Sequence, residues 1–136
     1  MKKLMTILLV CVCVLVCVGC NKQPQQVQGN QLLREGNVIN IDVTSLPELY
    51  NYSFDGKDAK AIVDYLSSLS LESDYEENPD VYAGMTWVIT LEYKDGEALS
   101  VYHFGNTFIR CEDGPWYKMT YEEANRFNTL LDELNN

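Results

Sequence analysis

The spacing of hydrophobic residues predicts a small unit of strands and helices after residue 37. Residues 37–43, NVINIDV, alternate between polar and apolar side chains as a half-buried strand does. Residues 57–70 instead place apolar side chains at the spacing of an amphipathic helix, which Asp55 can cap. A second helix is predicted after Thr120, because Thr120 and Glu123 have the spacing of a capping box.

Two dipeptides between the predicted helices indicate β-hairpins. Asp95-Gly96 and Gly105-Asn106 each separate segments of strand character, and both are typical of two-residue hairpin turns. The segment PWYKM (115–119) adds a further strand. The predicted order is β-α-β-β-β-β-α, an α+β fold in which two helices pack on one face of an antiparallel meander of about four or five strands.

Two-residue turns would fix how these strands pair, and hence which side chains share a face. With this register, the core face collects Trp87, Ile89, Leu91, Tyr102, Phe104, Ile109 and Cys111. The opposite face provides a candidate partner or ligand surface, which consists of Val88, Leu99, Val101, His103, Phe108 and Arg110. Exposed apolar patches commonly bind a partner, unless another segment of the chain covers them.

These patterns contain no catalytic set. Cys111 and His103 have the side chains that a nucleophile and its base would need, but the predicted register separates them onto opposite faces of the sheet. We therefore predict a non-catalytic protein without cofactor or metal. The acidic segment that contains Asp74, Glu76, Glu77 and Asp80 forms a solvated loop or, alternatively, a calcium site, although it lacks the ligand spacing and glycine of an EF-hand.

Aromatic residues suggest a second kind of site. Trp116 and Tyr117, together with Tyr50 and Tyr52, could form a platform that stacks against a sugar or a peptide. The alternative for Trp116 is a place in the core or at its edge.

The first twenty residues follow a different pattern. Two lysines precede an apolar run, residues 4–18, which is shorter than the roughly 20 residues of a membrane span. Four of the five cysteines lie between Cys11 and Cys20, without the nearby His, Asp or Glu that would complete a metal site. A positive start followed by a short apolar run is the layout of a secretory signal peptide.

The end of this run, Val16-Cys17-Val18-Gly19-Cys20, resembles the lipobox of bacterial lipoproteins, with Cys17 where Leu, Val or Ile is usual. The resemblance implies cleavage between Gly19 and Cys20, and a diacylglycerol on Cys20. With this cleavage, residues 1–19 are the signal peptide, residues 20–37 are the lipidated cysteine and a flexible tether rich in Gln and Asn, and residues 38–136 are a single extracytoplasmic domain. The alternative is an uncleaved N-terminal anchor. The whole is similar to small lipoproteins of Gram-positive bacteria.

The net charge of the chain restricts the kinds of partner that it can bind. Its formal net charge is −10 at pH 7, and without Lys2 and Lys3 the 8 remaining basic residues against 20 acidic ones give −12. Such a chain is repelled by nucleic acid and by anionic lipid headgroups, so the acyl chains must hold it to the membrane.

We therefore expect a lipid-anchored protein on the extracytoplasmic face of the cell membrane, which acts as a binding or accessory module through protein–protein contact. The alternative is a ligand-binding lipoprotein that holds a cell-wall sugar or peptide with its aromatic residues. A small hydrolase is the least favoured of the three.

Overall fold

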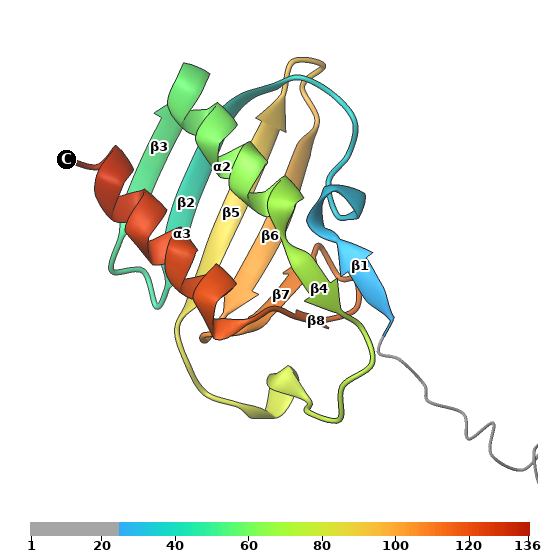
Figure 1. Cartoon of the computed structure of the whole chain (residues 1–136). Helices are drawn as coiled ribbons and strands as arrows, with labels where there is room; N and C mark the ends of the chain where they lie inside the picture. The colour runs from blue at the N-terminus through green and yellow to red at the C-terminus, as the bar shows by residue number, and fades with distance from the viewer. Residues whose placement is uncertain (1–24) are drawn as a thin grey trace, which may run out of the picture.

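The computed structural model describes residues 25–136, so the lipobox and the predicted signal peptide lie outside the described residues (Figure 1). The elements in chain order are β1 (Gln26–Gln28), the 3-10 helix η1 (Gly29–Gln31), β2 (Val38–Leu46), β3 (Asn51–Asp55), α2 (Gly56–Ser68), β4 (Ser70–Glu72), the 3-10 helix η2 (Pro79–Val81), β5 (Thr86–Tyr93), β6 (Ala98–Phe104), β7 (Phe108–Cys111), β8 (Tyr117–Lys118) and α3 (Tyr121–Leu134). Neither α2 nor α3 is long and apolar enough to cross a membrane.

The α+β class is confirmed, with two α-helices and one antiparallel sheet. The sheet has 8 strands in the order β1-β4-β8-β7-β6-β5-β2-β3, so the predicted number of strands and their predicted order were both wrong. The missed strands lack an alternating apolar pattern of useful length, since β1 and β4 have three residues each. Strand β3 was also missed; it follows Pro47, a residue type that disfavours a strand, but Pro47 falls in the turn before β3.

Both central hairpins have three-residue loops, so the predicted two-residue turns were wrong. The Tyr93 amide donates to the Glu97 carbonyl at 2.9 Å across Lys94-Asp95-Gly96. Gly96 has a φ of 87°, as in a type I turn closed by a glycine bulge. Phe104 pairs with Phe108 across the second loop. Each extra loop residue shifts the strand register by one position.

This shift turns β6 over relative to the prediction, because successive side chains alternate between the two faces. Val101, which pairs with Ile89, lies on the face with the helices, and so do Leu99 and His103. Tyr102 and Phe104 lie instead on the opposite face of the sheet, which neither α-helix covers and which we call the open face. The two shifts cancel at β7, so Ile109 and Cys111 are on the core face as predicted.

Helices α2 and α3 pack side by side on one face of the sheet (Figure 1). Phe127 of α3 is fully buried, with its ring 5.3 Å from that of Tyr65 in α2 and 6.2 Å from that of Trp87 in β5. This single side chain therefore joins both helices to the centre of the sheet. Burial of such a ring contributes on the order of 2–3 kcal/mol from apolar area alone.

The starts of the two helices are held differently. Asp55 occupies the N-cap position of α2, but its side chain makes no capping hydrogen bond. The capping box of α3 is confirmed: the Thr120 hydroxyl accepts from the Glu123 amide at 3.2 Å, and the Glu123 carboxylate accepts from the Thr120 amide at 3.0 Å. The same carboxylate accepts from the Ser70 amide at 2.8 Å. Glu123 thus anchors the start of α3 to β4.

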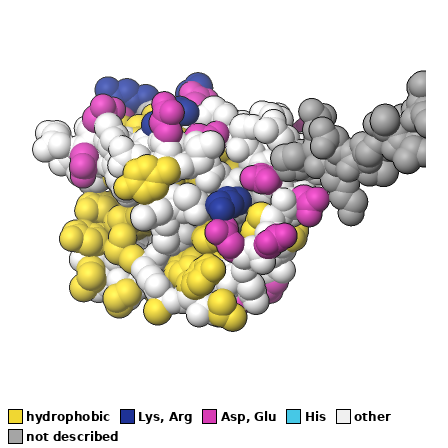
Figure 2. Space-filling model, turned by 60° about the horizontal axis from the view of Figure 1, so that its bottom comes forward, with side chains coloured by type: hydrophobic (Ala, Val, Ile, Leu, Met, Phe, Trp, Pro, Cys, Tyr) yellow, Lys and Arg dark blue, Asp and Glu magenta, His cyan; other side chains and the backbone are white. Residues whose placement is uncertain are grey.

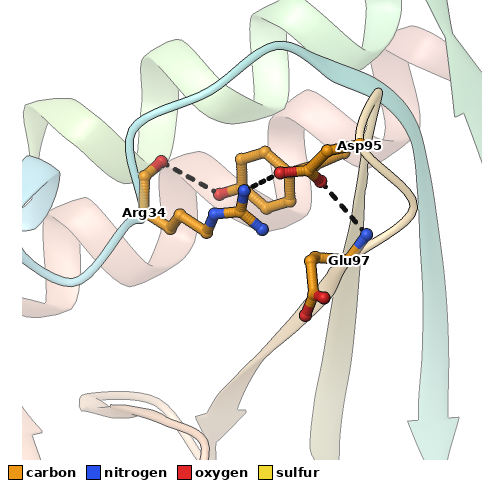
Figure 3. A network of polar contacts seen from close by, with 4 residues as sticks. Arg34, Asp95 and Glu97 are labelled. Carbon is orange, nitrogen blue, oxygen red and sulfur yellow. Dashed lines mark hydrogen bonds and ion pairs between the residues drawn. The ribbon is translucent and has the colours of Figure 1, made fainter.

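Part of the predicted tether belongs to the folded domain. Strand β1 pairs with β4, and the Gly29 amide donates to the Leu69 carbonyl at 2.8 Å. Arg34 forms an ion pair with Asp95, and its guanidinium lies 4.8 Å from the ring centre of Tyr93 (Figure 3). The predicted boundary at residue 37 was therefore too late, because backbone pairing orders a segment that has few large apolar side chains.

Candidate functional site

Exposed apolar side chains are concentrated at one end of the described domain. Leu46 at the end of β2 pairs with Thr86 at the start of β5, so the turn after β2 lies beside the loop before β5. The Gly105 amide donates to the Met85 carbonyl at 3.0 Å, which brings the β6–β7 turn to the same end. We call this region the apolar end; its exposed side chains are those of Leu46, Leu49, Tyr50, Val81, Tyr82, Met85 and Tyr121.

The apolar end comprises seven of the eight large hydrophobic side chains that are exposed in the described residues. The eighth, Ile39, lies toward the other end of the sheet, where β2 begins. Figure 2 views the apolar end and shows hydrophobic side chains over its left and lower parts, with acidic side chains gathered on the right. Single exposed apolar residues need no explanation, but a gathering of this kind marks an interaction surface.

A cleft of about 380 Å³ opens at the rim of the apolar end, between the β2–β3 hairpin, the start of β5 and α3. We call it the aromatic cleft; it is lined by Tyr50, Tyr52, Met85, Trp87, Asn128, Leu131 and Asp132. The rings of Tyr50 and Tyr52 are stacked with centres 6.3 Å apart, and the Trp87 ring lies 5.9 Å from Tyr50. Its volume falls within the range of small-ligand sites and would also accept side chains of a partner protein.

Local hydrogen bonds hold the tyrosines in this arrangement. The hydroxyl of Ser45, which is fully buried, accepts from the amides of Leu49 and Tyr50, both at 2.9 Å, and donates to the Pro47 carbonyl at 2.8 Å. The Ser45 amide in turn donates to the Tyr50 carbonyl at 3.0 Å. One small polar side chain therefore satisfies two amides and one carbonyl of the turn. The cleft is preorganised, which lowers the ordering cost of binding.

His103 lies behind the cleft and contacts Phe127, the residue of α3 that also packs against Trp87. Its ring centre is 5.5 Å from that of Phe127, its exposed fraction is 3%, and neither ring nitrogen has a hydrogen-bond partner among the described residues. Burial lowers the pKa of His103 to about 4. The imidazole is therefore neutral at pH 7 and acts as a core side chain.

The predicted partner surface is not one surface. Val101 and His103 are buried, and Leu99 lies beside them on the helix-covered face, so these three do not face a partner in this fold. Phe108 is on the open face but is covered, with its ring centre 5.8 Å from that of Tyr75 and 6.3 Å from that of Tyr82. The cause is the register shift, together with the β4–β5 loop that folds over the open face.

Two residues of the predicted partner surface are half-buried on the open face of the sheet. Val88 lies there on β5, and Arg110 on β7. The Arg110 guanidinium is 5.2 Å from the ring centre of Tyr102 and 4.5 Å from that of Trp116. Arg110 therefore stacks between aromatic rings of its own domain.

The predicted aromatic platform is divided by the fold. Trp116 is half-buried, and its indole N–H donates to Asp80 at 2.9 Å, which ties it to the loop before β5. Tyr117 pairs with Ile109 in the sheet. Tyr50 and Tyr52 lie instead with Trp87, which the sequence placed in the core. The alternation of Tyr50, Tyr52 and Phe54 was the signal for a strand with an aromatic face that could have revealed this cluster.

His103 and Cys111 share the helix-covered face, so their predicted placement on opposite faces was wrong. They are not direct neighbours across β6 and β7: Cys111 pairs with Val101, and His103 pairs with Ile109. No hydrogen bond joins them, and burial raises the pKa of the Cys111 thiol, which disfavours the thiolate nucleophile.

The acidic loop is partly engaged within the domain. Glu77 pairs with Lys118 at 2.5 Å, and Asp80 accepts from Trp116. Within residues 25–136, no three His, Cys, Asp or Glu side chains are grouped so that they could hold a metal ion.

Comparisons of this chain with protein-family models, with curated proteins and with solved structures gave no match. Function is therefore inferred from the apolar end, the aromatic cleft and the N-terminal sequence.

Proposed function

We propose that this protein is a membrane-anchored extracytoplasmic lipoprotein that acts as a non-catalytic binding module through protein–protein contact. The observation that carries the proposal is the aromatic cleft at the rim of the apolar end. Tyrosine and tryptophan are the residue types that most often dominate binding energy at protein interfaces, especially where they line a pocket. Three such rings line this cleft, beside further exposed apolar side chains.

The contact would be tested with the full-length protein, carrying a C-terminal affinity tag, in its own cells. Chemical crosslinking followed by affinity purification should recover a partner with the wild-type chain. Tyr50→Ala should reduce that recovery at least tenfold, because truncation at an interface hot spot costs about 2 kcal/mol or more. Ile39→Ala is the matched control, since Ile39 and Tyr50 are both 49% exposed but only Tyr50 lines the cleft.

If the wild-type chain recovers nothing above an untagged strain, or if both variants recover the partner equally, the proposed binding site is wrong. Circular dichroism of each purified variant confirms that its fold is retained.

The lipid anchor rests on the lipobox-like segment that ends at Cys20. Two acyl chains on one residue give stable membrane attachment. Cys20→Ala should therefore leave an uncleaved precursor or release the protein from membranes, and mass spectrometry of the wild-type N-terminus should find diacylglycerol on Cys20. A mutant that is processed and fractionates like the wild type would contradict lipidation.

A second candidate function is binding of a cell-wall sugar or peptide. Asn128 and Asp132 favour it, because exposed polar side chains beside aromatic rings suit hydroxyl and amide groups. Trp116→Phe would leave Trp87 as the only tryptophan of the described domain and hence as a reporter for the cleft. A titration with wall fragments that leaves the fluorescence of Trp87 unchanged at millimolar ligand would exclude this candidate.

A further inference from the structure

The described chain begins at the same end of the domain as the exposed apolar side chains. The carbonyl of Gln25 accepts from the Ser73 amide at 3.1 Å and from the Ser73 hydroxyl at 3.0 Å. Ser73 begins the loop that carries Val81, Tyr82 and Met85 to the start of β5. In Figure 1, β1 starts at the lower right, and the β4–β5 loop and the β2–β3 turn form the lower edge of the domain.

The separation between this end and the proposed lipid is short. Residues 21–24 are the ones between Cys20 and the described domain. From Cys20 to Gln25 the chain has five residue steps, which span at most about 16–18 Å when fully extended. Such a tether keeps the start of β1 within this distance of the anchored residue. If Cys20 is acylated, the end where β1 begins must stay close to the membrane.

The outermost side chains of this end have the chemistry of a membrane interface. Leu49 and Val81 are 69% and 72% exposed, and Tyr82 is 52% exposed. Apolar loop tips gain free energy when they enter the headgroup region, and tyrosine is enriched at that depth in membrane proteins. These tips lie on two separate loops, so they can touch one plane together.

The acidic residues at this end determine which lipids would be tolerated. Glu77 is neutralised by Lys118, and Asp80 bonds to Trp116. No ion pair to Glu48, Asp74 or Glu76 is formed within the described residues, and Glu48 is exposed next to Leu49. Anionic headgroups would repel these three carboxylates, and salt would screen that repulsion. Contact with the bilayer should therefore be closest on zwitterionic lipid.

We propose that the apolar end lies against the lipid bilayer, with the tips of the β2–β3 turn and the β4–β5 loop in the headgroup region. This inference rests on the proposed lipidation of Cys20. Tyr50 and Met85 belong both to the apolar end and to the cleft lining, so they form the edge of the cleft next to the membrane. The other edge stays accessible, because Asp132 is eleven residues into α3, about 16 Å along the helix from its start at the apolar end. The cleft would then face along the membrane surface, toward partners anchored in the same membrane.

The test uses full-length lipidated protein in phosphatidylcholine vesicles, with an environment-sensitive NBD fluorophore on one cysteine. The probe replaces Leu49 (Leu49→Cys) or, as the matched control, Ile39 (Ile39→Cys), in a Cys111→Ala background. Val81→Cys provides a second position on the apolar end if the first labels poorly. Vesicle flotation and the mass of the N-terminal residue report attachment separately from the probe.

The expected result is a blue-shifted emission at position 49, together with quenching by nitroxide-labelled lipid at least threefold stronger than at position 39. Vesicles that contain phosphatidylglycerol should weaken this quenching, and added salt should restore it. A water-exposed signal at position 49 on vesicles that carry the protein would overturn the inference and leave the anchor intact. A blue shift that disappears at one protein per vesicle would also overturn it, by identifying a second copy as the occupant. Failure of the protein to float would instead contradict lipidation.

Discussion

The buried His103 provides a quantitative test of the core. Its pKa is lowered to about 4 by burial, whereas the unfolded chain has the ordinary value near 6.5. Between these two values the unfolded state binds the proton and the folded state does not, so the free energy of unfolding falls as the pH falls. The contribution is fully present above pH 6.5 and is lost as the pH decreases toward 4.

The size of this effect follows from the difference between the two pKa values. A gap of about 2.5 units corresponds to about 3 kcal/mol of unfolding free energy. The side chain is 3% exposed, so solvent screening reduces this figure little. Natural domains have a stability of about 5–15 kcal/mol, and a loss of this size would be readily measured.

The assay is urea unfolding followed by tryptophan fluorescence at several pH values between 7 and 4, for the wild type and for His103→Leu. The carboxylates titrate in both proteins, so the difference between the two stability curves isolates the histidine. The wild type should lose about 3 kcal/mol relative to the variant over this range. His103→Gln serves as a second non-titrating variant if leucine disturbs the packing. Parallel curves for wild type and variant would refute a buried, neutral imidazole.

Three further predictions concern the packing of the helices and of the N-terminal segment. Glu123→Ala should lower stability by about 1–3 kcal/mol in urea unfolding, because it removes a helix cap and leaves the Ser70 amide without its partner, while the exposed Glu122→Ala should change stability little. Phe127→Ala should cost about 3–5 kcal/mol by the same measurement, and a loss under 1 kcal/mol would contradict its place in the core. Gly29→Ala should speed hydrogen exchange of residues 26–33, the segment that packs on the domain through Gly29, since a Cβ at residue 29 would lie 1.8 Å from the Leu66 carbonyl oxygen. Unchanged exchange of these residues would contradict this packing.

Periodicity and capping signals were sufficient for the long elements. The capping box at Thr120 correctly indicated α3, and the helix predicted over 57–70 from its apolar spacing corresponds to α2 at Gly56–Ser68. Alternation likewise identified the strands on either side of Asp95-Gly96. Such signals work because they describe one face of one element, which is independent of the rest of the fold.

The face of β6 could not be obtained in the same way. Asp-Gly and Gly-Asn fit a two-residue turn, but each hairpin adopts a three-residue loop, and one residue decides which side of a strand is buried. The Asp95 carboxylate accepts from the Glu97 amide at 3.1 Å, an interaction that supports the longer loop (Figure 3). For this reason His103 was expected at a surface and lies in the core.

The candidate site depended on long-range pairing. Tyr50 and Tyr52 were recognised as possible ligand contacts, but their partner was expected to be Trp116. Strand β3 was missed, and its pairing with β2 sets Tyr52 opposite Val43, on the face that Trp87 shares. No local pattern could bring residues 50 and 87 together.

The most direct test of the proposed binding module is photo-crosslinking in living cells from the full-length chain. A photoreactive phenylalanine analogue replaces Tyr50 at the cleft in one strain and Ile39 at the opposite end in another. A discrete crosslinked protein is expected from position 50, absent from position 39 and lost when Tyr52→Ala is added. Equal crosslinking from both positions, or none from position 50 in cells that express the protein, would contradict binding at the aromatic cleft.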